Sequence, residues 1–519
     1  MSPPKKKFCS QGVCLRSDLL EENTIDLIRS SLLDSKDNES KLSDAGVDII
    51  RHPFPVCVVR NVLNNTELLK IVVDDLKDIH FNEKSNDLYQ FKQSDDVINL
   101  SNSVAVQQLY DCIRNEAREW TAKVFGNINL KEQISATFSS YSFQDRLLCH
   151  DDKCGDRHIA FILYLVEDWE HTDGGALQLF STGPEGYPEG IAQNIYPEFN
   201  SLVLFEVSYV SFHQVAEVLS RKKNRISLNG WFHLENKQLG VNKCKTLNPH
   251  KIFCSDENIK LDNHFKKEYF EDDVLQDIKS YFSAKSETEL LGFLAPVFLD
   301  ELLKDLKSEH VKWLSRGPPN IRKYDIADTS CLPPALKTLQ NIFTSKSWFS
   351  YLKLITSLDF APSQTSNLEI WENGILPQCT FEIQKWTATN YTLIHDGDPE
   401  FHCEALDVVL RLPFTDTQVK HTEEDESIPA GQVIYLDGES KDEECLLHLG
   451  DKMNCLALVF RDAKTLRFTK YLPAEAEPFF QIFCTYYQWR PSVDQPDLRH
   501  CAEESDFSEG SDDVLSDSE

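Results

Sequence analysis

The sequence has no long apolar run and few cationic side chains for its acidic content. Its longest uninterrupted apolar stretch, from Ile159 to Val166, is far shorter than the roughly 20 residues of a membrane-spanning helix. The 53 Lys and Arg are outnumbered by 84 Asp and Glu, which gives a formal net charge of −31. Because proteins grip a phosphate backbone mainly with clustered Lys and Arg, this charge disfavours direct nucleic-acid binding. We expect a soluble protein, with no membrane segment, whose partner is a basic protein or peptide.

The 15 cysteines include no Cys-x-x-Cys pair. Neither a disulfide framework nor a zinc ribbon is therefore indicated, and reduced thiols in the nucleus or the cytoplasm are expected. The first residues, MSPPKKKFCS, have no apolar segment behind them and do not form a secretory signal. The short basic run at 3–7 fits either a nuclear import signal or a solvated tail, and both interpretations stay open.

At 519 residues the chain is too long for a single typical core. Apolar residues at helical spacing predict helices at 64–79 and 103–125, and short alternating runs after residue 130 predict antiparallel strands. Helices are expected again at 273–282 and 287–306, followed by further strands, so one order of elements occurs twice. We expect an α+β protein with these segments: a flexible N-terminus (1–40), a first domain (41–238, core 132–235), a linker (239–262), a second domain (263–498) and an acidic disordered tail (499–519).

A possible metal site lies in the stretch LLCHDDK, residues 147 to 153. In an extended strand, residues two apart point to the same face, so His150 and Asp152 can converge on one ion while Asp151 points away. His213, which follows another apolar strand, is the best second histidine. Two imidazoles and one carboxylate form the facial triad of non-haem Fe(II) oxygenases. Taken alone, however, this pair fits a solvated turn equally well.

Arg225 favours the metal interpretation. Alternation in NRISLNGWF places Arg225 and Ser227 on one face of a strand. A guanidinium inside a β core is costly unless an anion pairs with it, and its planar fork binds a carboxylate with two hydrogen bonds. Tyr164 could donate to the same carboxylate, although an ordinary core tyrosine is an equal alternative. His158 and His171 are weaker candidates as metal ligands, because one lies in an apolar strand and the other in a loop.

These residues resemble the Fe(II)- and 2-oxoglutarate-dependent oxygenases, and in particular the ribosomal-protein prolyl 3-hydroxylases. Besides the triad pattern, the resemblance rests on the blocks KSNDLYQFKQSDDV, IAFILYLV, VSFHQVAEVLS, NRISLNGWFH and RGPPNIRKYD. It implies two double-stranded β-helix domains, jelly rolls each flanked by helices, of which the second is degenerate. It also implies that His150, Asp152 and His213 hold the catalytic iron. Arg225 and Tyr164 are the implied 2-oxoglutarate ligands.

The same resemblance implies a dioxygenase that uses Fe(II), O2 and 2-oxoglutarate, with ascorbate as the reductant. The implied activity is hydroxylation of a proline in a small-subunit ribosomal protein, with effects on translation and its termination. Two alternatives remain: a 2-oxoglutarate oxygenase that acts on another protein or on a nucleic acid, and a catalytically silent interaction protein.

The second copy departs from the first. Matching YTLIHDGD to RLLCHDDK places His395 at the first ligand and Gly397 where Asp152 stood. Matching NCLALVFRD to NRISLNGWF places Cys455 at the position of Arg225, and His448 near that of His213. Without the carboxylate and the guanidinium, we expect the second domain to be non-catalytic.

Overall fold

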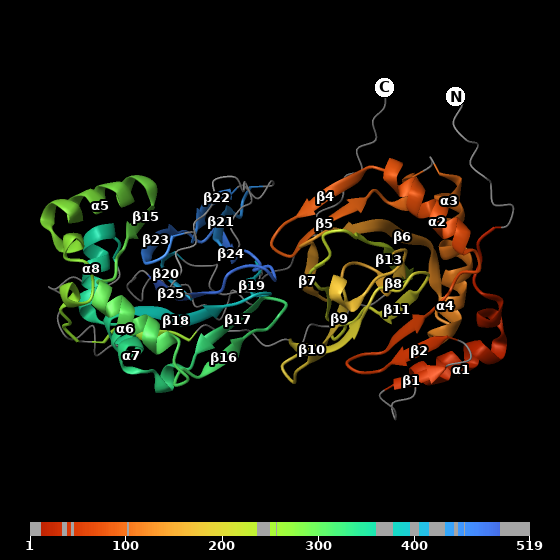
Figure 1. Cartoon of the computed structure of the whole chain (residues 1–519), viewed down its shortest axis with the longest axis horizontal. Coiled ribbons are helices and arrows are strands. Elements are labelled where there is room, and N and C mark those ends of the chain that lie inside the picture. The colour runs from red at the N-terminus through yellow and green to blue at the C-terminus, as the bar shows by residue number, and fades with distance from the viewer. Residues whose placement is uncertain are drawn as a thin grey trace, which may run out of the picture.

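The computed structural model has two halves side by side, each built on a curled antiparallel sheet with helices on its outer face (Figure 1). It describes residues 12–33, 39–42, 46–100, 103–235, 250–255, 257–359, 377–394, 404–414, 431–440, 445–450 and 452–487. The N-terminal half here means the described residues up to 235, and the C-terminal half means those from 250 onward. The basic run at 3–7 and the acidic tail lie outside the described residues.

The N-terminal half contains one 13-stranded sheet in the order β1-β2-β3-β11-β8-β13-β6-β5-β7-β12-β9-β10, with β4 beside β5. The strands are β1 (Glu39–Leu42), β2 (Val47–Ile50), β3 (Val56–Val59), β4 (Phe81–Ser85), β5 (Tyr89–Ser94), β6 (Leu130–Tyr141), β7 (Arg146–His150), β8 (Arg157–Tyr164), β9 (Leu177–Thr182), β10 (Pro188–Ile195), β11 (Leu202–Glu206), β12 (His213–Val215) and β13 (Arg225–Leu234). The strands predicted from the alternating runs are confirmed as β6, β8, β9, β11 and β13.

This sheet folds back on itself. Val56, Ala160 and Phe205 from one side of the strand order share an apolar cluster with Leu177 and Leu179 of β9. Alternation makes this possible, because the opposite faces of β6, β8 and β11 carry a second apolar set that packs against helices. The interior between the two sides of the sheet is where the functional side chains of this half lie.

Helices cover the outer face of the N-terminal sheet: α1 (Glu22–Leu33), α2 (Thr66–Asp75), α3 (Val104–Cys112) and α4 (Arg118–Val124), with a π-helical turn (Ile113–Ala117) joining the last two. The helices predicted at 64–79 and 103–125 are therefore confirmed, the second with an irregular turn. Part of the segment 1–40 is ordered rather than loose, because Leu19, Ile25 and Ile28 are buried in the first core.

The C-terminal half contains a nine-stranded sheet, with β15-β23-β20-β25-β18-β17-β16 in sequence and β14 and β19 at its sides, and a three-stranded sheet, β22-β21-β24. Its strands are β14 (Ile252–Phe253), β15 (Glu287–Leu291), β16 (Trp313–Arg316), β17 (Arg322–Ala327), β18 (Gln378–Trp386), β19 (Tyr391–Thr392), β20 (Ala405–Pro413), β21 (Val433–Asp437), β22 (Cys445–Leu449), β23 (Cys455–Arg461), β24 (Thr465–Thr469) and β25 (Phe479–Tyr487). The strand β14, inside the expected linker, pairs with β18 and so joins this sheet.

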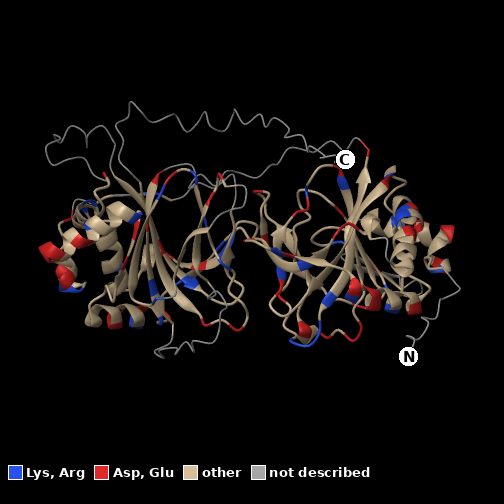
Figure 2. Ribbon diagram, turned by 90° about the horizontal axis from the view of Figure 1, so that it is seen from above, with Lys and Arg blue, Asp and Glu red and all other residues tan. Residues whose placement is uncertain are grey.

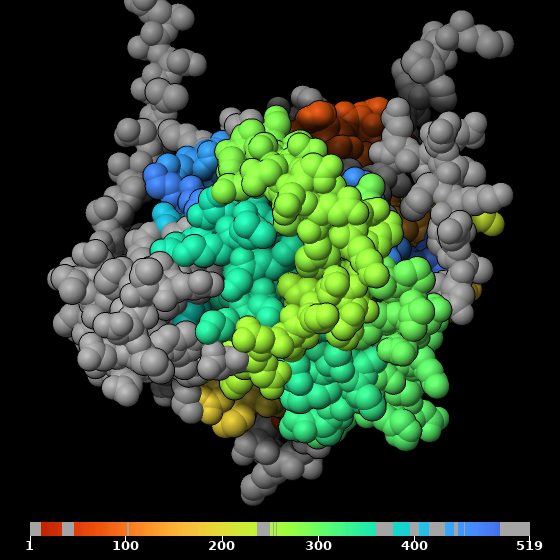
Figure 3. Space-filling view, turned by 90° about the vertical axis from the view of Figure 1, so that its left-hand side faces the viewer, coloured from red at the N-terminus to blue at the C-terminus, as the bar shows by residue number. Residues whose placement is uncertain are grey.

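Four helices cover the larger C-terminal sheet: α5 (Asp272–Lys285), α6 (Pro296–Leu306), α7 (Pro334–Phe343) and α8 (Lys346–Thr356). Figure 3 shows the molecule from the end of the C-terminal half, where much of the described surface belongs to this helical segment. The single helix predicted at 287–306 is wrong in its first part. Residues 287–291 form β15 and pair with β23, and the chain then turns at Gly292, with φ of 60°, before α6 begins at Pro296.

The two halves share one strand arrangement. In the first, β13 lies between β6 and β8, and β11 pairs with the other edge of β8; in the second, β25 lies between β18 and β20, and β23 pairs with the other edge of β20. The expected α+β fold, with a helix-flanked, curled antiparallel sheet, is confirmed, the expectation of two double-stranded β-helix domains is confirmed in part, and the segment boundaries remain predictions.

Charged residues of both signs are spread over both halves (Figure 2). Among the helices that the structure describes, none combines the length and the apolar character that crossing a bilayer requires.

Candidate metal centre

His150, Asp152 and His213 come together inside the N-terminal sheet. Strands β7 and β12 are antiparallel neighbours, and their register pairs His150 directly with His213. The two imidazole centroids are 4.3 Å apart. Asp152 Oδ1 lies 3.4 Å from His150 Nε2, and its Oδ2 lies 3.3 Å from His213 Nε2. The ligating atoms of the three residues lie within 4.8 Å of one another, the one such group in the described part of the chain.

Both imidazoles are held with Nε2 toward the shared centre. His150 Nδ1 hydrogen-bonds the Leu148 carbonyl at 2.7 Å, and His213 Nδ1 hydrogen-bonds the Ser211 carbonyl at 2.8 Å. A carbonyl accepts, so each Nδ1 carries the hydrogen and each Nε2 is left as a lone-pair donor, the usual second-shell arrangement of metal-ligating histidines. Two such nitrogens and one carboxylate on one side of a centre suit Fe(II) with open positions. The donor set therefore fits iron.

Asp152 reaches this centre by a turn rather than by strand alternation. Strand β7 ends at His150, and Asp152 has φ of 61°, a left-handed conformation that Asp tolerates better than most residues. The predicted convergence of His150 and Asp152 is found, but its stated geometric reason is corrected. Asp151 faces elsewhere, and its carboxylate accepts a hydrogen bond from the Lys153 backbone in a local turn.

Burial and pairing set the charges of the triad. Burial raises the pKa of Asp152, but the neighbouring histidines lower it by more, so the pKa lies well below its usual value. For His150, burial lowers the pKa, and the hydrogen bond and charge of Asp152 outweigh it and raise the pKa overall. The site thus holds its carboxylate ionised, as a metal ligand must be.

Arg225 lies at the first position of β13, with 1% of its surface exposed. Its Nε donates to the Gly175 carbonyl at 2.8 Å, its Nη2 to the Tyr164 hydroxyl at 3.2 Å and its Nη1 to the Ser227 hydroxyl at 3.4 Å. All of these acceptors are neutral, and within the described ranges no carboxylate forms an ion pair with Arg225. A buried cation with only neutral partners fits the binding of an anion from outside.

Close packing fixes this guanidinium. Gly175 has φ of 64°, and a Cβ there would lie 3.0 Å from Arg225 Cδ, so the backbone approach depends on glycine. The guanidinium carbon lies 5.0 Å from the ring centroid of Tyr164 and 5.1 Å from that of Tyr141. Burial raises the pKa of the Tyr164 hydroxyl despite the opposing effect of Arg225, so it remains a hydrogen-bond donor at neutral pH.

Sequence reasoning missed two residues of this site, Tyr141 and Trp231. Trp231 Nε1 donates to Asp152 Oδ2 at 3.1 Å, so the indole orients the carboxylate ligand. The alternation that places Arg225 and Ser227 on one face also includes Trp231, and extending it along the strand would have found this residue. Tyr141 required the register, because it is the β6 partner of Arg225.

The rival histidines lie away from the triad. His158 is buried in β8, with its Nδ1 3.9 Å from a Glu206 carboxylate oxygen. The His171 ring stacks on Tyr196 with centroids 3.9 Å apart. Neither contributes to the metal group, in keeping with their rank as weaker candidates.

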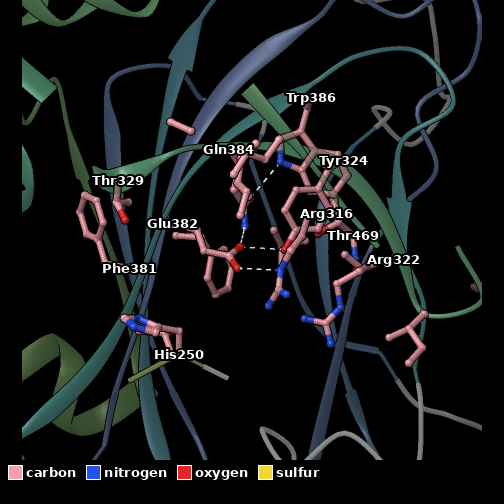
Figure 4. Close-up of a pocket in the computed structure, with 18 of the residues that line it drawn as sticks. His250, Arg316, Arg322, Tyr324, Thr329, Phe381, Glu382, Gln384, Trp386 and Thr469 are labelled. Atoms are coloured by element: carbon pink, nitrogen blue, oxygen red, sulfur yellow. Dashed lines mark hydrogen bonds and ion pairs between the residues drawn. The ribbon is translucent and has the colours of Figure 1, made fainter. Parts of the chain in front are cut away.

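The C-terminal half also has a pocket, of about 340 Å³ (Figure 4). Its lining includes the Glu382 carboxylate, which accepts three hydrogen bonds, from Arg316 Nε (3.0 Å), Tyr324 OH (2.8 Å) and Gln384 Nε2 (2.8 Å). Burial raises the pKa of Glu382, but Arg316 and these hydrogen bonds lower it by more. The carboxylate in this pocket is thus paired within the protein.

Two placements expected for the second copy are wrong. Cys455 begins β23, the counterpart of β11, whereas the counterpart of β13 is β25, whose first residue, Phe479, takes the place of Arg225. His448 lies on the edge strand β22, the counterpart of β10 rather than of β12. His395 and Gly397 lie outside the described residues.

Comparison with known proteins gives two family matches. Residues 136–233 match the 2OG-Fe(II) oxygenase superfamily, and residues 256–494 match a family described as oxoglutarate and iron-dependent oxygenase degradation C-term. The first match contains the triad and Arg225.

Curated relatives are similar over nearly the whole chain. Prolyl 3-hydroxylase OGFOD1 of Xenopus laevis is 33% identical over 477 residues, which cover 88% of this chain and 90% of the relative. The protein of that name from Mus musculus is 32% identical, covering 90% of this chain and 93% of the relative. Prolyl 3-hydroxylase sudestada1 of Drosophila melanogaster is 27% identical, covering 93% and 94%.

Proposed function

This chain belongs to the prolyl 3-hydroxylase family of the 2OG-Fe(II) oxygenase superfamily, and from that premise we propose that it hydroxylates a proline of a small-subunit ribosomal protein at carbon 3. The observation that carries the proposal is the buried Arg225, which has only neutral partners and lies in the same interior as the triad. A metal group alone fits many activities. A metal group with a separate carboxylate-binding cation fits a 2-oxoglutarate enzyme.

In this proposal each residue has a distinct task. His150, His213 and Asp152 hold Fe(II), and Trp231 fixes the Asp152 carboxylate. Arg225, with Tyr164, binds the far carboxylate of 2-oxoglutarate and so orients its keto-acid end toward the iron. When bound, Fe(II) activates O2 for oxidation of 2-oxoglutarate to succinate and CO2, with the second oxygen atom delivered to the prolyl C–H.

The interior also isolates the reaction. Phe205 stacks edge-on against the His213 ring with centroids 4.8 Å apart. Leu177 and Leu179 of β9 belong to the same interior apolar cluster as Phe205. These apolar side chains limit the access of water to the metal centre, which favours oxidation of the bound substrate over unproductive turnover.

The substrate and setting rest on two kinds of support. The relatives named prolyl 3-hydroxylase support a prolyl substrate. The net charge of −31 favours a basic partner such as a ribosomal protein. We further propose a nuclear and cytoplasmic protein, with ascorbate as the reductant and with effects on translation and its termination.

The test uses full-length protein with Fe(II), 2-oxoglutarate, O2, ascorbate and proline-containing peptides of small-subunit ribosomal proteins. We expect succinate together with a peptide product heavier by one oxygen atom, located on proline by fragment masses and on carbon 3 by NMR. A peptide with alanine in place of that proline is the matched control. Succinate formation without any oxidised prolyl product from this peptide set would contradict the substrate class and leave the oxygenase assignment intact.

A further inference from the structure

The C-terminal half packs against the two strands that carry the histidine ligands. Figure 1 shows β19 next to β7 where the two halves meet. Leu148 of β7 shares a buried cluster with Tyr391, Leu393 and Tyr471 of the C-terminal half. The Arg146 guanidinium, at the start of β7, lies 4.1 Å from the ring centroid of Tyr471. The junction is therefore built on a metal-bearing strand rather than on a remote surface.

Leu148 occupies a β-bulge that sets the direction of His150. The register pairs His213 with His150 and Val215 with Leu147, so β7 uses one more residue than β12 between these pairs. The extra residue lets both Leu147 and His150 face the interior, while Leu148 faces the C-terminal half. The Leu148 carbonyl also accepts the hydrogen bond from His150 Nδ1. Movement of Leu148 would thus turn the imidazole of His150.

Tyr471 also contacts the segment that follows His213. The Tyr471 hydroxyl donates to Glu217 Oε2 at 3.2 Å, and the Ala474 backbone N–H donates to the same oxygen at 2.9 Å. The Glu217 carbonyl accepts from the Gly175 N–H at 3.0 Å, and Gly175 is the residue that binds Arg225. Tyr471 is therefore linked, through Glu217 and Gly175, to Arg225 as well as to the strand that carries His150.

Buried polar atoms distinguish this junction from a merely adhesive one. Arg146 and Glu217 are 5% and 6% exposed, and Arg146 Nε and Glu217 Oε1 have no hydrogen-bond partner among the described residues. They line a cavity of about 320 Å³ between the halves. Buried polar groups left in this way cost stability, so apolar side chains would join the two halves more strongly. Their presence in the junction fits a role in geometry rather than in adhesion.

We propose that Tyr471 is a positioning residue of the iron centre. Packed on Leu148 and Arg146 and bonded to Glu217, it clamps the bulge that orients His150 and the segment that follows His213. The C-terminal half, although predicted to be non-catalytic, thereby sets the geometry of the metal site in the other half. This inference rests on the iron assignment proposed above.

The experiment measures metal binding without any substrate. Co(II) replaces Fe(II) as the probe, because its visible absorption reports coordination geometry. In the full-length protein, Tyr471→Ala should weaken Co(II) binding by about fivefold, below the 10–100-fold loss typical of direct second-shell partners, and should alter the Co(II) spectrum. Tyr471→Phe, which retains the ring on Leu148 and Arg146, should restore most of the affinity and the spectrum.

Tyr435→Ala is the matched control. Tyr435 is also a buried tyrosine, and its hydroxyl lies 3.2 Å from a carboxylate oxygen, that of Asp407, but this contact lies inside the C-terminal half. This variant should bind Co(II) as the wild type does. If it loosens Co(II) as much as Tyr471→Ala, the effect is general destabilisation and the positioning role is wrong.

The other outcomes separate the two proposals. If the wild type binds no Co(II), the iron assignment fails. If the wild type binds Co(II) and folded Tyr471→Ala binds it with the same affinity and spectrum, the positioning role is overturned while the iron assignment stands. Should Tyr471→Ala not fold, Tyr471→Leu takes its place, since it fills space without the planar ring or the hydroxyl, and wild-type Co(II) binding in that variant would likewise overturn the positioning role.

Discussion

The two halves differ in how their buried charged side chains are neutralised. In the N-terminal half, the candidate metal ligands His150, Asp152 and His213 face one centre, and the cation Arg225 has only neutral hydrogen-bond partners among the described residues. In the C-terminal half, the strand registers place Arg467 where His213 lies, since each pairs with the third residue of the adjoining strand, β21 or β9. The position of a candidate metal ligand in the N-terminal half thus holds a cation in the C-terminal half.

The carboxylate that pairs with Arg467 comes from the same half of the chain. Asp407 is fully buried, 2.5 Å from Arg467 Nη1 and 3.5 Å from Arg461 Nε, and Thr485 donates to it at 2.9 Å. Burial raises the pKa of Asp407, but the two arginines lower it by more, so the pKa lies below its usual value of 3.8. This charge cluster is held within one half and does not depend on a ligand.

In the N-terminal half the buried guanidinium lies on β13 and the aromatic ring on β8. In the C-terminal half the two residue types lie on the opposite members of the corresponding strand pair. Phe479 takes the place of Arg225, and Arg411 takes the place of Tyr164, because Gln481 pairs with Arg411 as Ser227 pairs with Tyr164. The Arg411 guanidinium lies 3.8 Å from the Phe479 ring centroid and donates to the Gly431 carbonyl, two residues before β21, as Arg225 donates to Gly175 before β9. The comparison teaches that a guanidinium in this position does not by itself make a catalytic site.

The largest test of the comparison removes a metal ligand. Asp152→Ala should abolish Fe(II) binding and lower prolyl oxidation by at least about 1,000-fold, or about 4 kcal/mol of transition-state stabilisation. The wild type should hold one Fe(II) per chain and this variant none, measured by metal analysis of the purified proteins. A second equivalent of tightly bound iron that survives in Asp152→Ala would break the comparison, because it would place a metal in the other half.

The counterpart test removes the internal anion. Asp407→Ala leaves buried arginines without their carboxylate and should cost about 3–5 kcal/mol of stability, seen in denaturant unfolding of the C-terminal half. The ionised carboxylate stabilises the fold above pH 3.8 and loses this effect as the pH falls through its lowered folded-state pKa. The gap between the two proteins should therefore persist at neutral pH and shrink only below about 3.8. Glu439→Gln, at an exposed ion pair with Lys464, should show no measurable change.

The two arginines should differ in their effect on the co-substrate. Arg225→Lys replaces a planar fork by a point charge and should raise the KM for 2-oxoglutarate by about 30-fold, or about 2 kcal/mol, with Co(II) binding retained. Arg411→Lys, the matched change in the C-terminal half, should leave that KM unchanged. Loss of Co(II) binding in Arg225→Lys would show instead that the guanidinium supports the metal strands.

Sequence reasoning named the three residues that the structure brings together, His150, Asp152 and His213, but misplaced those of the second copy, for one physical reason. His150, Asp152 and His213 stand beside strands whose alternation is visible in the sequence. The bulge at Leu148 is not visible, because it arises from pairing between distant strands, and neither is the turn that gives Asp152 its positive φ. In the second copy, the motif match chose β23 in place of β25. The guanidinium of that half belongs to Arg411 on β20, so no arginine marks the position on β25 that corresponds to Arg225.

Trp231 offers the smallest and most specific test. Its counterpart across the two registers, Thr485, donates to Asp407, so in both halves this position of the strand holds a carboxylate, one for a metal and one for arginines. Trp231→Phe retains the ring but loses the N–H bond to Asp152, and should weaken Co(II) binding by about 10-fold, at the low end of second-shell effects. Thr485→Val should lower stability by about 1 kcal/mol and leave Co(II) binding alone. If Trp231→Phe binds Co(II) like the wild type, Asp152 is oriented by its turn alone. Trp231 and Thr485 would then correspond in position, but Trp231 would have no role in metal binding.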